Sequence, residues 1–161
     1  MRKEGPRVKQ LSHELEQLLD QIRADLGCDF CSIGLIHTEE QVIYWRYSSG
    51  QLNEKCRRIT ERTGRGIGET VIRIGRAVEL VTSELFVTRR IQEFPILLAE
   101  KLASAFVVPI VVGRQTLAVL LAGNRREHVH VSIDRHLVLN AGAQLTAFIV
   151  QQQNNPNFSL I

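Results

Sequence analysis

The sequence predicts an α+β fold, in which helices pack on a central antiparallel sheet. A helical pattern of apolar residues opens the chain, and a second one closes it. Between them lie two pairs of strand-like segments, and each pair is joined by a turn of only a few residues. Strands joined by such short turns pair antiparallel, and the terminal helices can then bury their apolar faces on the sheet.

The first element is an amphipathic helix over residues 7–26. Its apolar residues recur at intervals of three and four, the period of one helix face, and they are Val8, Leu11, Leu15, Leu18, Leu19, Ile22 and Leu26. Gly27 lies where a helix stop is expected. The period then changes to two over residues 30–36, and this alternation predicts a strand whose successive side chains face opposite sides.

A second strand follows and completes a hairpin. The polar residues 37–40 form the turn, and residues 42–47 are rich in the β-branched and aromatic side chains that favour strands. Residues 48–55 are polar and predict a loop. A short strand is predicted after this loop, around residues 57–61.

The middle of the chain predicts an irregular region with two short helices. The first helix follows a glycine-dense turn, Gly64-Arg65-Gly66-Ile67-Gly68-Glu69. Residues 77–81 predict an extended segment, whereas residues 82–94 show no clean period. Pro95 begins the second helix, which residues 96–102 complete, because the first helical position needs no N–H donor.

Two long apolar runs predict the centre of the sheet. Residues 105–112 and 116–122 are apolar at nearly every position, which is typical of strands buried on both faces. Gly113-Arg114-Gln115 between them predicts a tight hairpin connection. In the last helix, Ser132 is the predicted cap and Asp134 lies in the first turn.

Length and composition predict one domain over residues 7–150, with a flexible N-terminus at residues 1–6 and a tail at residues 151–161. Of the 161 residues, 44% are hydrophobic, which is enough for one core. No apolar stretch is long enough to span a bilayer, and the first residues lack the apolar segment of a secretory signal. A cytoplasmic location without membrane association is therefore expected. The net charge of +3 is too small for a dedicated nucleic-acid binder.

The cysteines and histidines predict neither a metal site nor a catalytic site. Cys28 and Cys31 have Cys-x-x-Cys spacing, but a zinc site needs a second pair and only Cys56 remains. Residues three apart on a strand face opposite sides, so buried reduced thiols are predicted instead. Three histidines lack a carboxylate or cysteine at a confirming spacing, and surface positions are predicted for His128, His130 and His136. We expect no metal, cofactor or catalytic residue.

The order of elements and two motifs resemble the GAF domain family. The first motif is the glycine-dense turn followed by Gly75-Arg76-Ala77-Val78. The second is the apolar hairpin that joins Ala105-Phe106-Val107-Val108-Pro109-Ile110 to Leu117-Ala118-Val119-Leu120-Leu121-Ala122. The resemblance spans residues 8–150. It implies a GAF-like fold with one ligand pocket, and it leaves the ligand open because these domains bind cyclic nucleotides, bilins, haem, amino acids or anions.

A narrower resemblance is to the stand-alone nitrate receptors of the Nre regulatory system. It is carried by the segments Asp29-Phe30-Cys31, Tyr44-Trp45-Arg46-Tyr47, Gly50-Gln51-Leu52-Asn53, Lys55-Cys56-Arg57-Arg58-Ile59, Phe94-Pro95-Ile96 and Ala99-Glu100. This resemblance implies nitrate as the ligand and a sensor histidine kinase, regulated in trans, as the partner. The implied ligand-binding residues are Trp45, Gly66, Ile67, Gly68, Phe94, Pro95, Ile96 and Leu97.

The chemistry of these residues is compatible with an anion site. Two helices are predicted to begin near Ile67 and Ile96, and free N–H groups at helix starts attract anions. Gly66 and Gly68 allow close approach of the backbone, and Trp45 supplies a flat wall with one N–H donor. Plainer interpretations stay open, since a strand tryptophan more often packs than binds, and glycine-rich turns usually only reverse the chain.

Three other functions compete with nitrate sensing. The domain can sense a different small metabolite, or it can act as an interaction module without a ligand, as a homodimer formed through the terminal amphipathic helices. The enzymatic alternative is a methionine sulfoxide reductase of GAF fold, whose reactive thiols follow the middle helix. Residues 77–104 contain no cysteine, so a sensor without enzymatic activity is expected.

Overall fold

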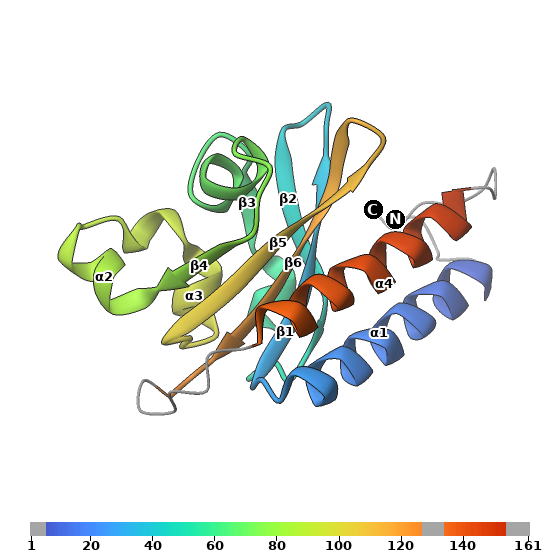
Figure 1. The fold of residues 1–161 in the computed structure, drawn as a ribbon, viewed down its shortest axis with the longest axis horizontal. Helices are drawn as coiled ribbons and strands as arrows, with labels where there is room; N and C mark the ends of the chain where they lie inside the picture. The colour runs from blue at the N-terminus through green and yellow to red at the C-terminus, as the bar shows by residue number, and fades with distance from the viewer. Residues whose placement is uncertain (1–5, 127–133, 154–161) are drawn as a thin grey trace.

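The computed structural model describes residues 6–126 and 134–153, which contain one six-stranded antiparallel sheet covered by helices (Figure 1). Across the sheet the strands run in the order β3-β2-β1-β6-β5-β4. Their bounds are β1 (Phe30–His37), β2 (Val42–Ser49), β3 (Thr60–Arg62), β4 (Val78–Val81), β5 (Ser104–Val112) and β6 (Gln115–Asn124). The predicted α+β, antiparallel fold is confirmed.

Two long helices cover one face of the sheet. α1 (Pro6–Leu26) and α4 (Arg135–Gln153) lie side by side, with α1 on β1 and β2 and α4 on β5 (Figure 1). Their buried side chains, including Leu15, Leu19 and Leu145, form one cluster with alternate residues of the strands. Complete burial of a leucine or isoleucine side chain stabilises a fold by about 1.5–3 kcal/mol, so this cluster is one of the two main sources of stability.

Short helices from the middle of the chain cover the opposite face, where they build the second apolar cluster. They are η1 (Glu54–Arg58), η2 (Gly68–Ile72), α2 (Thr82–Val87), η3 (Ile91–Glu93) and α3 (Pro95–Ala99). Alternation along β1 separates the two clusters, because Cys31, Ile33 and Leu35 face the long helices whereas Phe30 faces the short ones. The site implied by the resemblance belongs to this second face.

The predicted central hairpin is confirmed. β5 and β6 each have a strand on both sides, and nearly all their side chains are buried or half-buried. Val112 pairs with Gln115 across the turn, where Gly113 adopts a φ of 66°. This left-handed conformation favours glycine, which explains its place in a two-residue connection.

The middle region differs from the prediction in detail. Residues 54–58 form a 3-10 helix, capped by the Asn53 side chain, which accepts a hydrogen bond from the Lys55 N–H. The strand predicted around residues 57–61 is therefore shifted and shorter. Residues 82–94, which show no sequence period, contain α2 and η3, both too short to display one. The helix that begins at Pro95 ends at Ala99, before Lys101 adopts a φ of 53°.

The two terminal helices extend slightly beyond residues 7–150. Asp134 caps α4, since its Oδ1 accepts from the His136 N–H, while Ser132 lies outside the described residues. α4 continues to Gln153, three residues into the predicted tail, and α1 begins at Pro6, inside the predicted flexible N-terminus.

Candidate functional site

Trp45 lies at the centre of the second face. It projects from β2 into the buried cluster that also contains four other predicted site residues, Ile67, Phe94, Ile96 and Leu97. Its ring packs closely against β1 at Gly34, where an added Cβ would lie 3.0 Å from two ring carbons. The indole is fully buried, and among the described residues its N–H forms no hydrogen bond of normal geometry, although it lies near enough to the Glu61 carboxyl group to lower the pKa of that group. A buried donor of this kind is uncommon and needs an explanation.

The glycine-dense turn docks closely against two neighbouring backbone segments. Gly66 has a φ of 52°, and a Cβ there would lie 2.1 Å from the Glu93 carbonyl oxygen. A Cβ at Gly68 would lie 1.9 Å from the Thr63 carbonyl oxygen. Both distances are far below van der Waals contact, so neither position accepts a side chain in this geometry. The turn thereby fixes the buried Ile67 beneath the segment that precedes α3.

The start of α3 completes the set of predicted residues. Phe94, Ile96 and Leu97 are buried, whereas Pro95 is half-buried and reaches the surface. The structure therefore brings the two predicted helix starts to the same face of the sheet, although the segments are well separated in sequence.

The expectation of free amide donors at these two starts is wrong for the N–H groups with assigned partners. The Gly68 N–H donates to the Arg65 carbonyl at 2.9 Å, and the Leu97 N–H donates to the Phe94 carbonyl at 3.0 Å. The Ile96 N–H donates to Glu61 Oε1 at 3.3 Å. The Glu61 carboxylate therefore already accepts the Ile96 N–H, which the prediction gave to a bound anion.

Glu61 is a candidate site residue that the sequence analysis missed. Its side chain is only 5% exposed, and its Oε2 has no hydrogen-bond partner within the described residues. Burial raises the pKa of the carboxyl to about 7, against the opposing effects of the Ile96 N–H and the nearby Trp45 indole. No local pattern in the sequence marks Glu61 as buried, because β3 has only three residues and the other two, Thr60 and Arg62, are exposed.

A solvent-open groove of about 470 Å³ begins beside Glu61. Its lining comes from β3, the glycine turn and the segment before α3, and consists of Thr60, Glu61, Arg62, Arg65, Arg89, Gln92, Glu93 and Pro95. Arg62, Arg65 and Arg89 are exposed, and none of them forms an ion pair with another described residue. Three unpaired guanidinium groups make the groove attractive to anions.

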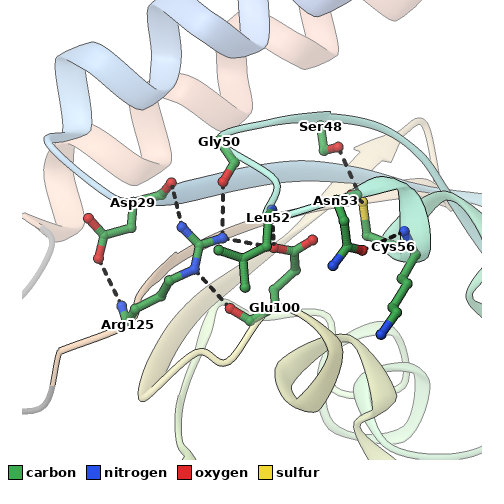
Figure 2. A network of polar contacts seen from close by, with 9 residues as sticks. Asp29, Ser48, Gly50, Leu52, Asn53, Cys56, Glu100 and Arg125 are labelled. Carbon is green, nitrogen blue, oxygen red and sulfur yellow. Dashed lines mark hydrogen bonds and ion pairs between the residues drawn. The ribbon is translucent and has the colours of Figure 1, made fainter.

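A second buried carboxylate anchors the opposite end of α3. Arg125 Nη2 donates to Glu100 Oε2 at 2.7 Å and to the Gly50 carbonyl at 3.0 Å, and Arg125 Nε donates to the Glu100 carbonyl (Figure 2). The Asp29 carboxylate accepts from the Arg125 N–H, and the Leu52 N–H donates to Glu100 Oε2. This network ties the end of β6 to α3 and to the loop after β2, so its role is structural.

The three thiols are buried and unpaired, as predicted. Burial raises the pKa of Cys28 to about 11 and also raises those of Cys31 and Cys56, which keeps all three as unreactive thiols. The argument that Cys28 and Cys31 face opposite sides is wrong, because Cys28 precedes β1 and both pack in the cluster under α1 and α4.

The predictions that remain concern the histidines, metal sites and membrane-spanning helices. His136 is exposed, as predicted, whereas His128 and His130 lie outside the described residues. The described ranges contain no group of three His, Cys, Asp or Glu side chains arranged to hold a metal ion. They also contain no helix that is both long and apolar enough to cross a bilayer.

The fold and the site define an α+β domain in which short helices enclose a polar centre against one face of an antiparallel sheet. Comparison with protein-family models identifies this class. The GAF domain model matches residues 10–149, and the chain belongs to the GAF domain family.

The chain is similar to several solved structures, one of which is described by its ligand-binding site. A structure of the NreA protein of Staphylococcus aureus, mutated in its nitrate-binding site, is 30% identical with a TM-score of 0.68 and covers 80% of this chain and 97% of its own. A hypothetical protein of S. aureus is 32% identical with a TM-score of 0.62, and the match covers 70% of this chain and 94% of that protein. The GAF domain of an Acinetobacter phosphoenolpyruvate-protein phosphotransferase is 21% identical with a TM-score of 0.70, and the match covers 95% of this chain and 94% of that domain. This likeness shows the fold alone. No curated protein matches the chain.

Proposed function

We propose that this chain is a small-ligand sensor that binds nitrate beside Trp45 and modulates a partner histidine kinase in trans. The observation that carries the proposal is the buried indole N–H of Trp45, which forms no hydrogen bond of normal geometry but interacts with the neighbouring Glu61 carboxyl group, among residues from β2, the glycine turn and α3. A buried donor without a well-formed hydrogen bond costs up to about 1–3 kcal/mol, which a bound acceptor would offset. The similarity to the NreA protein, whose structure is described by its nitrate-binding site, supports nitrate as that acceptor.

The size and charge of nitrate suit the chemistry of this face. The ion is planar and singly charged, so it can lie against an aromatic ring and accept hydrogen bonds in its own plane. Charge-assisted hydrogen bonds contribute about 1.5–3 kcal/mol each. Two or three of them, after the cost of association, correspond to a Kd of roughly micromolar to millimolar. This range suits a sensor of a metabolite.

Titration calorimetry tests the binding step. We expect heat of binding with nitrate and none with chloride at the same ionic strength. Trp45→Phe keeps an apolar ring but removes the N–H donor, so nitrate affinity should fall about tenfold or more. Tyr44→Phe on the same strand is the matched control, because Tyr44 points to the exposed side and its hydroxyl bonds Glu40. Unchanged affinity in a folded Trp45→Phe protein would remove the indole from the site, and no nitrate binding by the unaltered chain would refute the function.

The regulatory step needs a separate measurement. Autophosphorylation of the oxygen-sensing histidine kinase from the same organism should change when this protein is added, and the size of the change should depend on nitrate. Trp45→Phe should remove the nitrate dependence while leaving the protein folded. If adding the protein does not change the rate of kinase autophosphorylation at any nitrate concentration, the partner assignment is refuted, whereas the proposal of nitrate binding still stands.

Exposed apolar residues on α4 favour a homodimer formed through the terminal helices as a second function. Leu137, Leu139 and Val150 are each at least 40% exposed on this helix. Sedimentation equilibrium of the wild-type chain and of Leu137→Glu tests this role. A dimer that Leu137→Glu dissociates supports it, whereas a monomeric wild type at high micromolar concentration excludes it.

A further inference from the structure

The Glu61 carboxyl group occupies a place that the proposed anion also needs. Glu61 Oε1 accepts the Ile96 N–H, one of the amide donors of the proposed site, and its Oε2 has no partner in the part of the chain that the structure describes. The Trp45 indole N–H, which forms no hydrogen bond of normal geometry, interacts with the same carboxyl group and lowers its pKa. A carboxylate is a small planar anion, so the charged Glu61 side chain and a nitrate ion compete for the same donors.

Among the residues that the structure describes, no buried cation balances this carboxylate. The buried polar or charged side chains of the described residues are Ser32, Ser48, Ser49, Glu61 and Glu100. A charged Glu61 and a bound anion would repel each other strongly in a poorly solvated site, so the two cannot both be charged there at low cost. A proton on Glu61 is the smallest change that removes the conflict.

The charged groups that face Glu61 do not supply the missing positive charge from within the site. β3 contributes Arg62, the glycine turn contributes Arg65, and the segment before α3 contributes Arg89 and Glu93, all at the groove. The three arginines are exposed and form no ion pair with Glu61, and Glu93 is paired with Arg90 at 2.9 Å. The inner neighbours, the Trp45 indole on β2 and the Ile96 N–H on α3, do not titrate near neutral pH.

We propose that Glu61 takes up a proton when a small anion such as nitrate occupies the site beside Trp45, so that the protein binds the anion and one proton together. The protonated carboxyl no longer repels the anion, and its O–H becomes an additional donor. This inference rests on the proposed function, because it adds a proton to the same binding event.

Protonation is accessible near neutral pH. Burial already raises the pKa of Glu61 to about 7 in the absence of a ligand. If binding requires the protonated form, nitrate affinity is nearly constant below this pH and falls tenfold for each pH unit above it. From pH 6 to pH 9, the dissociation constant should therefore rise about a hundredfold.

Calorimetry of the full chain tests the coupling. Nitrate is titrated at pH 8.5 in HEPES and in Tris, two buffers with different ionisation enthalpies, at one fixed chloride concentration. The observed heats should differ by an amount that corresponds to uptake of nearly one proton per nitrate. Glu61→Gln should bind nitrate with no proton uptake and with an affinity that does not change from pH 6 to pH 9. Glu79→Gln, at an exposed position of β4, should retain the wild-type proton uptake.

The outcomes separate the two proposals. Nitrate binding by the wild type with equal heats in both buffers and a constant affinity overturns the coupling and leaves the proposed function in place. Proton uptake that persists in Glu61→Gln also overturns it, because another group would then bind the proton. If Glu61→Gln fails to fold, the wild-type buffer comparison and pH profile still decide. Absence of nitrate binding to the wild type from pH 5 to pH 9 overturns both proposals.

Discussion

Replacing Glu61 by glutamine should change how the stability of the ligand-free protein depends on pH. The folded-state pKa of about 7 lies above the ordinary value of 4.5, so the native protein binds more protons than the unfolded chain between these values. The contribution of Glu61 to the free energy of unfolding is therefore greatest below about pH 4.5, and it is lost as the pH rises to 7. The difference of about 2.5 in pKa, at 1.36 kcal/mol each, gives a total loss of about 3 kcal/mol.

Urea unfolding at pH 5 and pH 8, followed by circular dichroism, measures this effect. Relative to wild type, Glu61→Gln should gain about 2–3 kcal/mol in unfolding free energy between pH 5 and pH 8, because a neutral amide has no ionisation cost. Comparing the two proteins at each pH cancels the contributions of all other titrating groups. Glu79→Gln on β4 is the control, and its stability difference from wild type should not change with pH. An equal pH dependence in wild type and Glu61→Gln would refute the account of Glu61 as a buried, destabilised carboxylate.

Three further predictions concern the glycine turn, the Arg125 network and the cysteines. Gly68→Ala should lower the free energy of unfolding in urea by about 2 kcal/mol or more, because the new Cβ would clash with the Thr63 backbone. Gly64→Ala is the control and should change stability little, because the space around Gly64 is open. Arg125→Ala should cost about 3–5 kcal/mol in the same assay, since it leaves the charge of Glu100, a side chain with 1% exposure, without its cation; a loss below 1 kcal/mol would contradict this. The three buried thiols should react with a chromogenic disulfide reagent only after unfolding, and rapid labelling of the native protein would contradict their burial.

The parts of the fold with strong local patterns could be predicted from the sequence. Five of the apolar residues that predict α1, namely Leu15, Leu18, Leu19, Ile22 and Leu26, pack in the cluster beneath that helix, and the two long apolar runs define β5 and β6 as central strands. Both sequence patterns are long, and both arise because the residues are buried in the sheet or against it. In the middle region, by contrast, α2 and η3 span six and three residues. Elements this short owe their form to packing on the sheet, so their sequence carries no period.

The sequence analysis named the apolar residues of the candidate site and missed Glu61, the buried carboxylate beside them. Trp45 and Ile96 were placed at the site through a family resemblance, and the structure buries both in one cluster. Glu61 went unnoticed because it stands between two exposed residues, Thr60 and Arg62, in a strand of three residues. Nothing local marks the central one as buried. Only the pairing of Glu61 with Ile43 on β2, a contact between separate segments, turns the carboxyl inward.

The position of β1 between β2 and β6 has a consequence for how the chain folds. The β1–β2 hairpin can form early, because its strands are neighbours in sequence. The other edge of β1 must wait for β6, and the Asp29 N–H meets the Asn124 side chain across 95 positions of the chain. Such long-range pairing raises the contact order and slows folding. While the chain is being synthesised, β1 therefore presents an unpaired apolar edge, and this edge is where misassembly between nascent copies would begin.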